Sequence, residues 1–434
     1  MKLKNKIDCH NPEELKRVLE LDSLKRNKHL NNIMRIFNDL ESSVTLSLDG
    51  GWGTGKSVFA KKLEYLSNES QNEQENEFPQ VDASVLNDFR TQFDIYYFNS
   101  WEYDMYEKPL EIFLYDLIKH RKRIMDRQDK NVDRLDKVIK KGILPVANST
   151  LKLLSGGTVD FDDLSSGETK DEKLLKSATY VDDLKERINE VLEILTEEKK
   201  IVIIIDELDR CKPTFAVELL EIIKHYFSYE KISYIICSNK NQLSHTVKKY
   251  YGSDFNGFGY LDRFIDLEYN LPIPDTKEYL NQVLNVSNAS KFPYNELVKV
   301  NCSYFDLSLR EINKYVFISE IIINRFKRKD SRASKNFDLF YNLIFPLYCF
   351  GLKLTHPNNY KNFLENSGVD ELEGYIDENK DYFERILDLN TPESEGYLPD
   401  KKSILLTKKY YSDLFSTRDM EPLENLKEAL SLFN

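Results

Sequence analysis

The residues Gly50–Ser57, called the phosphate loop below, have the composition and spacing of a loop that binds phosphate. They fit the pattern G-x-x-x-x-G-K-[ST], with a β-type run before them and a helical pattern from Lys56 onward. Glycines let the backbone turn its amides toward an anion, and the dipole of the following helix adds positive potential. The predicted nucleotide-binding residues are Gly50, Gly51, Trp52, Gly53, Thr54, Gly55, Lys56 and Ser57.

Phosphoryl chemistry at this loop needs Mg²⁺ and a positioned water. Lys56 is expected to bind the β/γ-phosphate oxygens, and the Ser57 hydroxyl to bind Mg²⁺. Ile201–Ile205 consists of five consecutive β-branched residues, which predicts a strand buried on both faces, and Asp206 and Glu207 follow it. We expect Asp206 to hold Mg²⁺ through water and Glu207 to polarise the attacking water. The alternative is a carboxylate pair that caps the next helix.

Three further side chains are candidates for the catalytic set. Asn239 follows the buried run Ile232–Cys237, so it can orient the attacking water or cap a helix. Arg263 can act as an arginine finger, and Arg310, which starts a later helix, can act as a second sensor of the nucleotide. Arginines on helices are usually solvated or paired with acids, so both interpretations of each arginine stay open.

Two charged stretches also have more than one interpretation. Asp209 and Arg210 can pair with each other, can face the nucleotide of a neighbouring subunit, or can form a surface salt bridge. Lys119–Lys141 holds ten basic residues against four Asp. It can bind nucleic acid or an acidic partner, but its alternating signs at helical spacing favour pairing along one solvated helix.

The elements that must position these residues alternate between strand and helix, and helical patterns dominate after Pro274. This order predicts an α/β fold with a parallel sheet in a three-layer core, followed by an α-helical domain. The predicted domains are a helical segment at 1–41, a core at 42–275 with an insertion at about 105–195, and a helical lid and C-terminal domain at 276–434. The predicted strands are Val44–Leu48, Phe93–Phe98 and three buried runs, Ile201–Ile205, Ile232–Cys237 and Phe264–Tyr269.

Composition limits the class of protein. The 434 residues carry a net charge of −12 and are 41% hydrophobic and 12% aromatic, which argues against disorder along most of the chain. The five cysteines are scattered without a CxxC pair, which favours reduced thiols in a cytoplasmic protein over a zinc site. The apolar run Leu339–Leu352 has 14 residues and contains Pro346 and Gly351, so it suits a buried helix rather than a membrane span. No secretory signal is recognised at the start of the chain.

The motifs together resemble the KAP family of P-loop NTPases. The resemblance rests on the Trp inside the phosphate loop, Phe98–Trp101, the Asp-Glu-Leu-Asp-Arg-Cys-Lys-Pro stretch Asp206–Pro213, and Tyr260–Phe264, in the family's order over roughly residues 25–320. It implies an ATPase core of the additional-strand type that uses ATP and Mg²⁺, and association of copies through the nucleotide face. Family members commonly have Asp where Glu207 stands, and often Lys where Arg263 stands.

Many family members carry transmembrane helices between their two nucleotide motifs. The insertion at about 105–195 is charged and broken by glycines, so it does not resemble a membrane-spanning segment. Bacterial members are often linked to defence against phage or plasmids, and the resemblance implies such a role here.

Three functions fit these features. The first is an ATP-driven switch or assembly protein that acts with copies of itself and with a protein effector. The second is a binding scaffold in which nucleotide is structural. The third is a motor or sensor ATPase stimulated by nucleic acid bound at Lys119–Lys141. A full catalytic set without a separate effector motif favours the first.

Overall fold

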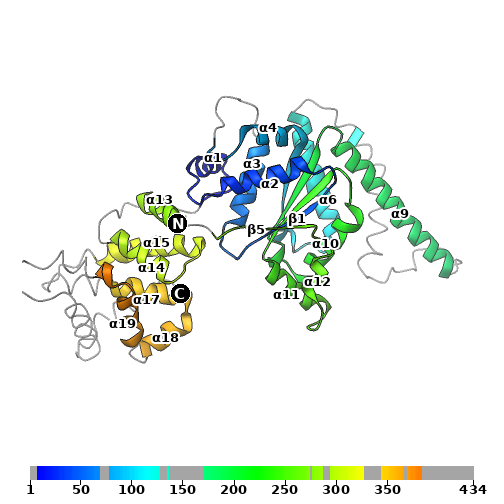
Figure 1. Cartoon of the computed structure of the whole chain (residues 1–434). Coiled ribbons are helices and arrows are strands. Elements are labelled where there is room, and N and C mark those ends of the chain that lie inside the picture. Colours follow the sequence, from blue (N-terminus) through cyan, green and yellow to red (C-terminus); the bar gives the residue numbers. More distant parts are fainter. Residues whose placement is uncertain are drawn as a thin grey trace, which may run out of the picture. The chain divides into compact units, whose positions relative to one another are not determined.

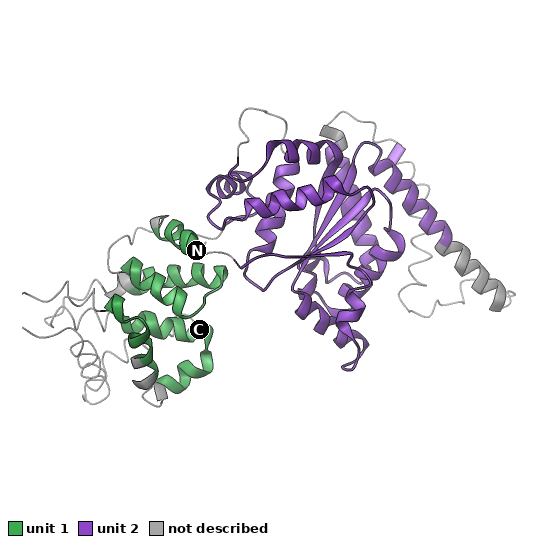
Figure 2. Ribbon diagram, in the orientation of Figure 1, with its two compact units in different colours: residues 1–6, 275–434 green, residues 7–274 purple. Residues whose placement is uncertain are grey.

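The computed structural model describes residues 7–68, 78–127, 134–135, 170–273, 276–286, 294–326, 344–365 and 369–383. The chain divides into two compact units (Figure 2). One is Ile7–Pro274, and the other contains the described helices of Asp275–Asn434. Within the described residues, every helix is too short or too polar to cross a membrane.

Five parallel strands form the sheet of the first unit, in the order β2-β3-β4-β1-β5 (Figure 1). Strand β4 lies between β1, which precedes the phosphate loop, and β3, which ends in the acidic pair. The predicted α/β core with a parallel sheet of the additional-strand type is therefore confirmed. The strands are β1 (Thr45–Asp49), β2 (Phe93–Asn99), β3 (Lys200–Asp206), β4 (Ile232–Ser238) and β5 (Leu267–Asn270).

The central strands are buried on both faces, as their continuous apolar runs predicted. Every residue of β4 is buried, and only Lys200 of β3 is partly exposed. The prediction for Phe264–Tyr269 was wrong in two respects: β5 begins at Leu267, and most of its residues are exposed. Phe264 instead belongs to the turn after a short helix, where its amide donates to the Leu261 carbonyl. Strand β5 pairs with β1 alone, so it is an edge strand, which explains its exposure.

Helices cover both faces of the sheet, which gives the predicted three layers (Figure 1). Alternate residues of β3 enable this, since Ile203 and Ile205 pack into one core and Val202 and Ile204 into the other. Helices α1 (Pro12–Leu21), α2 (Asn27–Asp39), α3 (Lys56–Asn68) and α4 (Ala83–Gln92) contribute to the second core. Helices α6 (Pro109–Arg127), α9 (Lys170–Leu195), α10 (Pro213–Tyr226), α11 (Lys240–Tyr251) and α12 (Gly257–Leu261) contribute to the first.

The second unit is helical in its described parts. Its core contains a buried polar network in which the Asn301 amide donates to the Tyr315 hydroxyl at 2.6 Å, and that hydroxyl donates to the Leu347 carbonyl at 2.8 Å. Of the apolar run Leu339–Leu352 identified in the sequence, residues 345–352 lie in the buried helix α17, and residues 339–343 lie outside the described residues. The helices are α13 (Thr276–Val286), α14 (Tyr294–Tyr304), α15 (Leu309–Phe326), α17 (Phe345–Thr355), α18 (Pro357–Glu365) and α19 (Val369–Glu378).

Candidate functional site

The register of the sheet brings the phosphate loop, the acidic pair and Asn239 to one edge. Asp49 of β1 pairs with Ser238 of β4, Cys237 of β4 pairs with Asp206 of β3, and Asp206 pairs with Asn99 of β2. Four parallel strands therefore end at the same level. The phosphate loop, the acidic pair and the residue after β4 all begin there, which is where open α/β sheets bind ligands.

The phosphate loop has the backbone that its glycines allow. Gly53 and Gly55 have φ angles of 78° and 91°, which side chains with a Cβ rarely adopt. Lys56 begins α3 and is buried, and its ammonium donates to the carbonyls of Gly50 and Gly51. Burial lowers the pKa of Lys56, while the carboxylate of Asp209 is the strongest influence that raises it. Ser57 follows Lys56 in the first turn of the same helix.

Asp206 is held as a buried carboxylate at the end of β3. It is 1% exposed, and it accepts hydrogen bonds from the Tyr97 hydroxyl at 2.6 Å and from the Glu207 amide at 2.8 Å. Burial raises the pKa of Tyr97, and the charge and hydrogen bond of Asp206 raise it further, so the phenol stays a donor. A buried carboxylate and the Ser57 hydroxyl are hard oxygen donors of the kind that suits Mg²⁺. Tyr97 had no local sequence signal for this contact.

Glu207 adopts a left-handed backbone, with φ 61° and ψ 22°. Such a conformation is uncommon outside glycine, and strained residues gather at functional sites. Its carboxylate lies 2.8 Å from the Arg210 guanidinium. That guanidinium also lies 5.5 Å from the centre of the Trp101 ring, a cation–π distance. Arg210 therefore pairs with Glu207, and the alternative of a pair with Asp209 is not observed.

Asp209 connects the phosphate loop to the end of β4, a role that the sequence did not suggest. It is 8% exposed, and one carboxylate oxygen accepts from the Trp52 indole at 2.7 Å and from the backbone amide of Asn239 at 3.1 Å. A tryptophan within the loop and an aspartate after the acidic pair are visible in the sequence. Their contact depends on the register of the preceding strands β1 and β3 through β4, and that register is a property of the fold.

The other candidates lie in different places. Asn239 is at the expected edge, and its side-chain oxygen caps α11 by accepting from the Gln242 amide at 3.1 Å. Arg263 is exposed and lies in the turn between α12 and β5. Arg310 is exposed on α15 of the helical unit. The catalytic roles of all three stay predictions.

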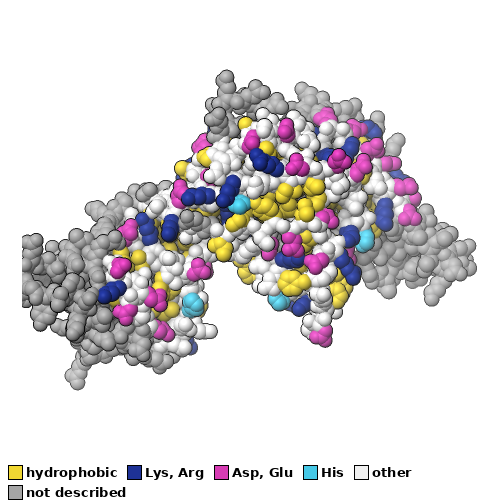
Figure 3. All heavy atoms as spheres, viewed as in Figure 1, with side chains coloured by type: hydrophobic (Ala, Val, Ile, Leu, Met, Phe, Trp, Pro, Cys, Tyr) yellow, Lys and Arg dark blue, Asp and Glu magenta, His cyan; other side chains and the backbone are white. Residues whose placement is uncertain are grey.

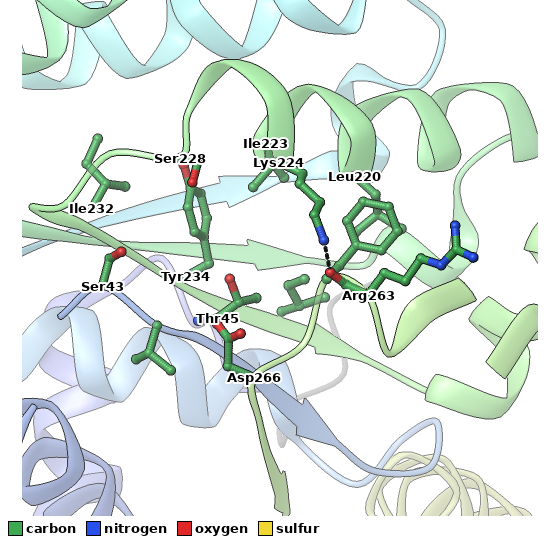
Figure 4. Close-up of a pocket in the computed structure, with 13 residues that line it drawn as sticks. Ser43, Thr45, Leu220, Ile223, Lys224, Ser228, Ile232, Tyr234, Arg263 and Asp266 are labelled. Carbon is green, nitrogen blue, oxygen red and sulfur yellow. Dashed lines mark hydrogen bonds between the residues drawn. The ribbon is translucent and has the colours of Figure 1, made fainter. Parts of the chain in front are cut away.

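A cavity of about 150 Å³ is also found away from this edge. It lies at the amino ends of the strands and is lined by residues such as Ser43, Thr45 and Ile232. Figure 4 shows Lys224 bonded to the backbone of Arg263, while the Arg263 guanidinium points away from the cavity. Because the phosphate loop contributes nothing to its lining, this cavity is separate from the nucleotide-binding edge.

The basic stretch Lys119–Lys141 lies partly outside the described residues. In its described part, Arg121 is buried and bonds the Asp94 carboxylate at 2.5 Å and the Leu195 carbonyl at 2.8 Å, and Arg134 pairs with Glu197. All of these partners lie outside the stretch and Arg121 is buried, so these two arginines pair within the chain but do not show the predicted pairing along one solvated helix. Over the face in Figure 3, acidic and basic side chains of the described residues are interspersed.

Comparison with known families is decisive for the class of this chain. The model of the KAP family P-loop domain matches residues 26–342, well over half of the 434 residues. The chain belongs to the KAP family of P-loop NTPases. This assignment agrees with the geometry, because the match contains the phosphate loop, Asp206 and Glu207. Family membership supports nucleotide binding at the loop.

One curated protein is similar to a short part of this KAP family chain. The phage T7 exclusion protein of Escherichia coli (strain K12) is 22% identical over 90 residues. These residues make up 21% of this chain and 12% of that protein, so the chain matches a small fraction of the relative's length.

Proposed function

We propose that this chain binds ATP with Mg²⁺ at the phosphate loop and hydrolyses the ATP. The observation that carries the proposal is the register of β1, β4 and β3, which brings the phosphate loop, Asp206 and Asn239 to one edge of the sheet. Without that register the motifs would be separate sequence patterns. With it, a phosphate, a divalent cation and an attacking water have their expected ligands within one site.

Each residue has a distinct part in the proposed reaction. Lys56 leaves the loop carbonyls and binds the β/γ-phosphate oxygens, while Ser57 and Asp206 hold Mg²⁺, which neutralises phosphate charge when bound. Glu207 accepts a hydrogen bond from the attacking water and aligns it with the γ-phosphorus. Asn239 orients the same water from the end of β4. Positioning matters more than basicity, because little covalent chemistry falls to the protein.

We further propose that the ATP cycle acts as a switch that controls assembly, in a bacterial cytoplasm and in defence against phage. The supports are the membership of the KAP family and the short similarity to a phage exclusion protein. Copies of the chain associate through the nucleotide face, and a protein effector reads the assembled state. The exposed Arg263 is available to a neighbouring copy, as a finger supplied between subunits would have to be.

The test is phosphate release by wild type, Lys56→Ala and Glu207→Gln, with Lys249→Ala as a control on an exposed lysine of α11. Lys56→Ala should lose ATP binding, whereas Glu207→Gln should bind ATP and lose turnover by about 100-fold or more, the size of a missing general base. A wild-type protein that neither binds nor hydrolyses any nucleoside triphosphate would refute the proposal.

The same variants separate the alternative functions. If nucleotide is structural, Glu207→Gln keeps the biological activity, and ATP still raises the unfolding temperature of the protein. If the chain is a nucleic-acid motor, DNA or RNA stimulates turnover, and the stimulation falls steeply with salt. The switch instead predicts an increase in native mass with ATP and no effect of nucleic acid.

A further inference from the structure

A buried arginine outside the motifs contacts the phosphate loop. Arg26 lies at the beginning of α2 and is 4% exposed. One terminal nitrogen of its guanidinium donates to the Thr54 carbonyl at 2.5 Å, and the other donates to the Pro272 carbonyl at 2.8 Å. These partners are 28 and 246 residues away in sequence, so the contact is a product of the fold.

The corner between α1 and α2 holds Arg26 in place. Asp22 closes α1 in a left-handed conformation, with φ 37° and ψ 40°. Its carboxylate then accepts from the backbone amides of Arg26 at 2.8 Å and of Asn27 at 3.1 Å. These bonds satisfy amides at the start of α2, as a helix cap does. The direction of the Arg26 side chain is therefore set by a well-bonded turn.

The bond to Thr54 explains how the phosphate loop keeps its shape. Thr54 lies between Gly53 and Gly55, both at positive φ. A loop that turns amides toward a phosphate turns carbonyls the other way, where hydrogen-bond donors from the protein can stabilise them. Arg26 is such a donor from outside the loop. Lys56, in contrast, donates to loop carbonyls that it must leave in order to bind phosphate.

The second bond connects the same guanidinium to the end of the sheet. Pro272 comes two residues after the end of β5, and the boundary between the two compact units follows Pro274. The amide of Leu271 also donates to the Asp49 carbonyl at 2.9 Å, directly before the phosphate loop. The segment after β5 is therefore bonded directly to Asp49, before the phosphate loop, and through Arg26 to Thr54 within it.

The charge of Arg26 supports a role beyond packing. Both described partners are neutral carbonyls, and the Nε atom is buried without a hydrogen-bond partner. Burial lowers the pKa of Arg26 to about 10, so the guanidinium remains charged near neutral pH. A buried cation with neutral partners is costly in isolation, and an anionic ligand nearby offsets that cost. The polyphosphate of a nucleotide would be such a ligand.

We propose that Arg26 is a positioning residue for nucleotide binding, one that holds the phosphate loop open to phosphate and couples its conformation to the exit of β5. The inference rests on the proposed function, because it assumes that the phosphate loop binds a nucleotide. Loss of the guanidinium should loosen Thr54 and Pro272 together. Loosening of either segment should in turn weaken binding of the phosphates.

The experiment compares Arg26→Ala and Arg26→Lys with Arg35→Ala, a change of an exposed arginine on the same helix that pairs with Asp82. Arg26→Ala should weaken ATP·Mg²⁺ binding about 10- to 100-fold, the equivalent of losing charge-assisted hydrogen bonds. Arg26→Lys retains the charge without the planar fork, so it should give an intermediate loss. Arg35→Ala should bind as wild type does. Equal affinity of wild type and both Arg26 variants would overturn the inference.

Hydrogen exchange of the nucleotide-free proteins separates this inference from the proposed function. Peptides that span Gly50–Ser57 and Leu267–Ile273 should both exchange faster in Arg26→Ala and Arg26→Lys, and neither should change in Arg35→Ala. If wild type fails to bind ATP while both peptides loosen, the proposed function is wrong and the coupling stands. If wild type binds ATP but only one peptide loosens, the coupling is wrong. Arg26→Lys serves both measurements if Arg26→Ala does not fold.

Discussion

The indole of Trp52 donates a hydrogen bond of 2.7 Å to the buried carboxylate of Asp209. The bond joins the phosphate loop to the turn after the acidic strand. The same carboxylate oxygen accepts from the backbone amide of Asn239. One atom thus connects the phosphate loop, the turn after β3 and the end of β4. The negative charge of Asp209 also acts on Lys56, whose pKa it raises against the larger lowering effect of burial. A γ-phosphate bound by Lys56 would compete with that carboxylate.

This competition predicts that Trp52 responds to nucleotide. The chain has two tryptophans, so Trp101→Phe leaves Trp52 as the single reporter. ATP·Mg²⁺ should change the emission of Trp52 in this variant, and the added change Asp209→Ala should shift emission to longer wavelength without nucleotide, because the freed indole becomes more hydrated. Asp209→Ala should also lower the free energy of unfolding by about 1–3 kcal/mol, because its carboxylate accepts two hydrogen bonds that the variant loses. An emission spectrum insensitive to both changes would contradict the competition.

The pair between Glu207 and Arg210 leads to a second expectation. Their groups are 2.8 Å apart, and the side chains are 17% and 25% exposed. The proposed general base is thus engaged by a cation and must leave it to meet the attacking water. Arg210→Ala should therefore raise kcat several-fold while the Kd for ATP stays near the wild-type value. Steady-state phosphate release checks this, with Lys212→Ala as the neighbouring control. A fall in kcat would show that Arg210 itself assists the reaction.

The sequence predicted what depends on local pattern and failed where partners are distant. The phosphate loop, β3 and β4 were recognised because glycine spacing and continuous β-branched runs are strong local signals. Helix α4 was missed, although Asp82 before Ala83 accepts from the Ser84 amide as a typical helix cap. The predicted strand began too early because Phe264 is apolar. Phe264 instead lies in a turn and packs against the core from there.

The supporting residues of the site were harder to predict. Asp209 and Arg210 were recognised as charged neighbours, but their observed partners, Trp52 and Glu207, depend on the direction in which each side chain points in the fold. Arg26 has a partner 246 residues away, and no periodicity or motif records such a contact. The predicted residues are those whose chemistry has a fixed spacing. The contacts of Arg26 and Asp209 were missed because they depend on strand order and burial, which the sequence does not state.

Lys62 predicts a pH dependence of stability. It is 4% exposed on α3, its ammonium donates to Asn27 at 2.7 Å, and Asp22 is 4.0 Å away. Burial lowers the pKa of Lys62 to about 8 despite Asp22. An unfolded lysine stays protonated up to about pH 10.4, so between the two values the unfolded state binds more protons. The contribution of Lys62 to stability should therefore rise with pH in that range.

The measurement is urea unfolding of wild type and Lys62→Met between about pH 7.5 and 9.5, which brackets the lower part of that range. The difference in the free energy of unfolding should shift in favour of wild type as pH rises, by at most about 1.4 kcal/mol per pH unit. The exposed Lys249→Met should show no such trend. A difference that stays constant with pH would contradict the assignment.

Two glycines of the helical unit offer a matched test of its packing. A Cβ at Gly351 in α17 would lie 2.2 Å from the Phe305 ring, whereas a Cβ at Gly374 in α19 would have no atom within 4 Å. Gly351→Ala should destabilise the protein by about 1–3 kcal/mol through overpacking. Gly374→Ala should stabilise it by about 0.5–1 kcal/mol, because alanine favours a helix over glycine. Thermal unfolding of the full chain measures both, and equal shifts would show that α17 is packed differently.

Arg263 gives the sharpest test of association. It is exposed in the turn between α12 and β5, so a neighbouring copy can reach it, as a finger supplied between subunits requires. Arg263→Ala and Lys56→Ala should each lose most turnover. When they are mixed, Lys56→Ala copies supply Arg263 to intact phosphate loops on Arg263→Ala copies, and part of the activity should return.

The recovery should rise with total protein concentration, since it depends on contacts between copies. A mixture of Lys56→Ala with Glu207→Gln is the appropriate control, because both changes disable the same site and an intact finger cannot restore it. Arg17→Ala, a change of an exposed arginine on α1, should leave wild-type turnover unaltered. If the mixture of Arg263→Ala and Lys56→Ala stays inactive while both variants remain folded and associated, Arg263 is not a finger between subunits, and its exposure serves another contact.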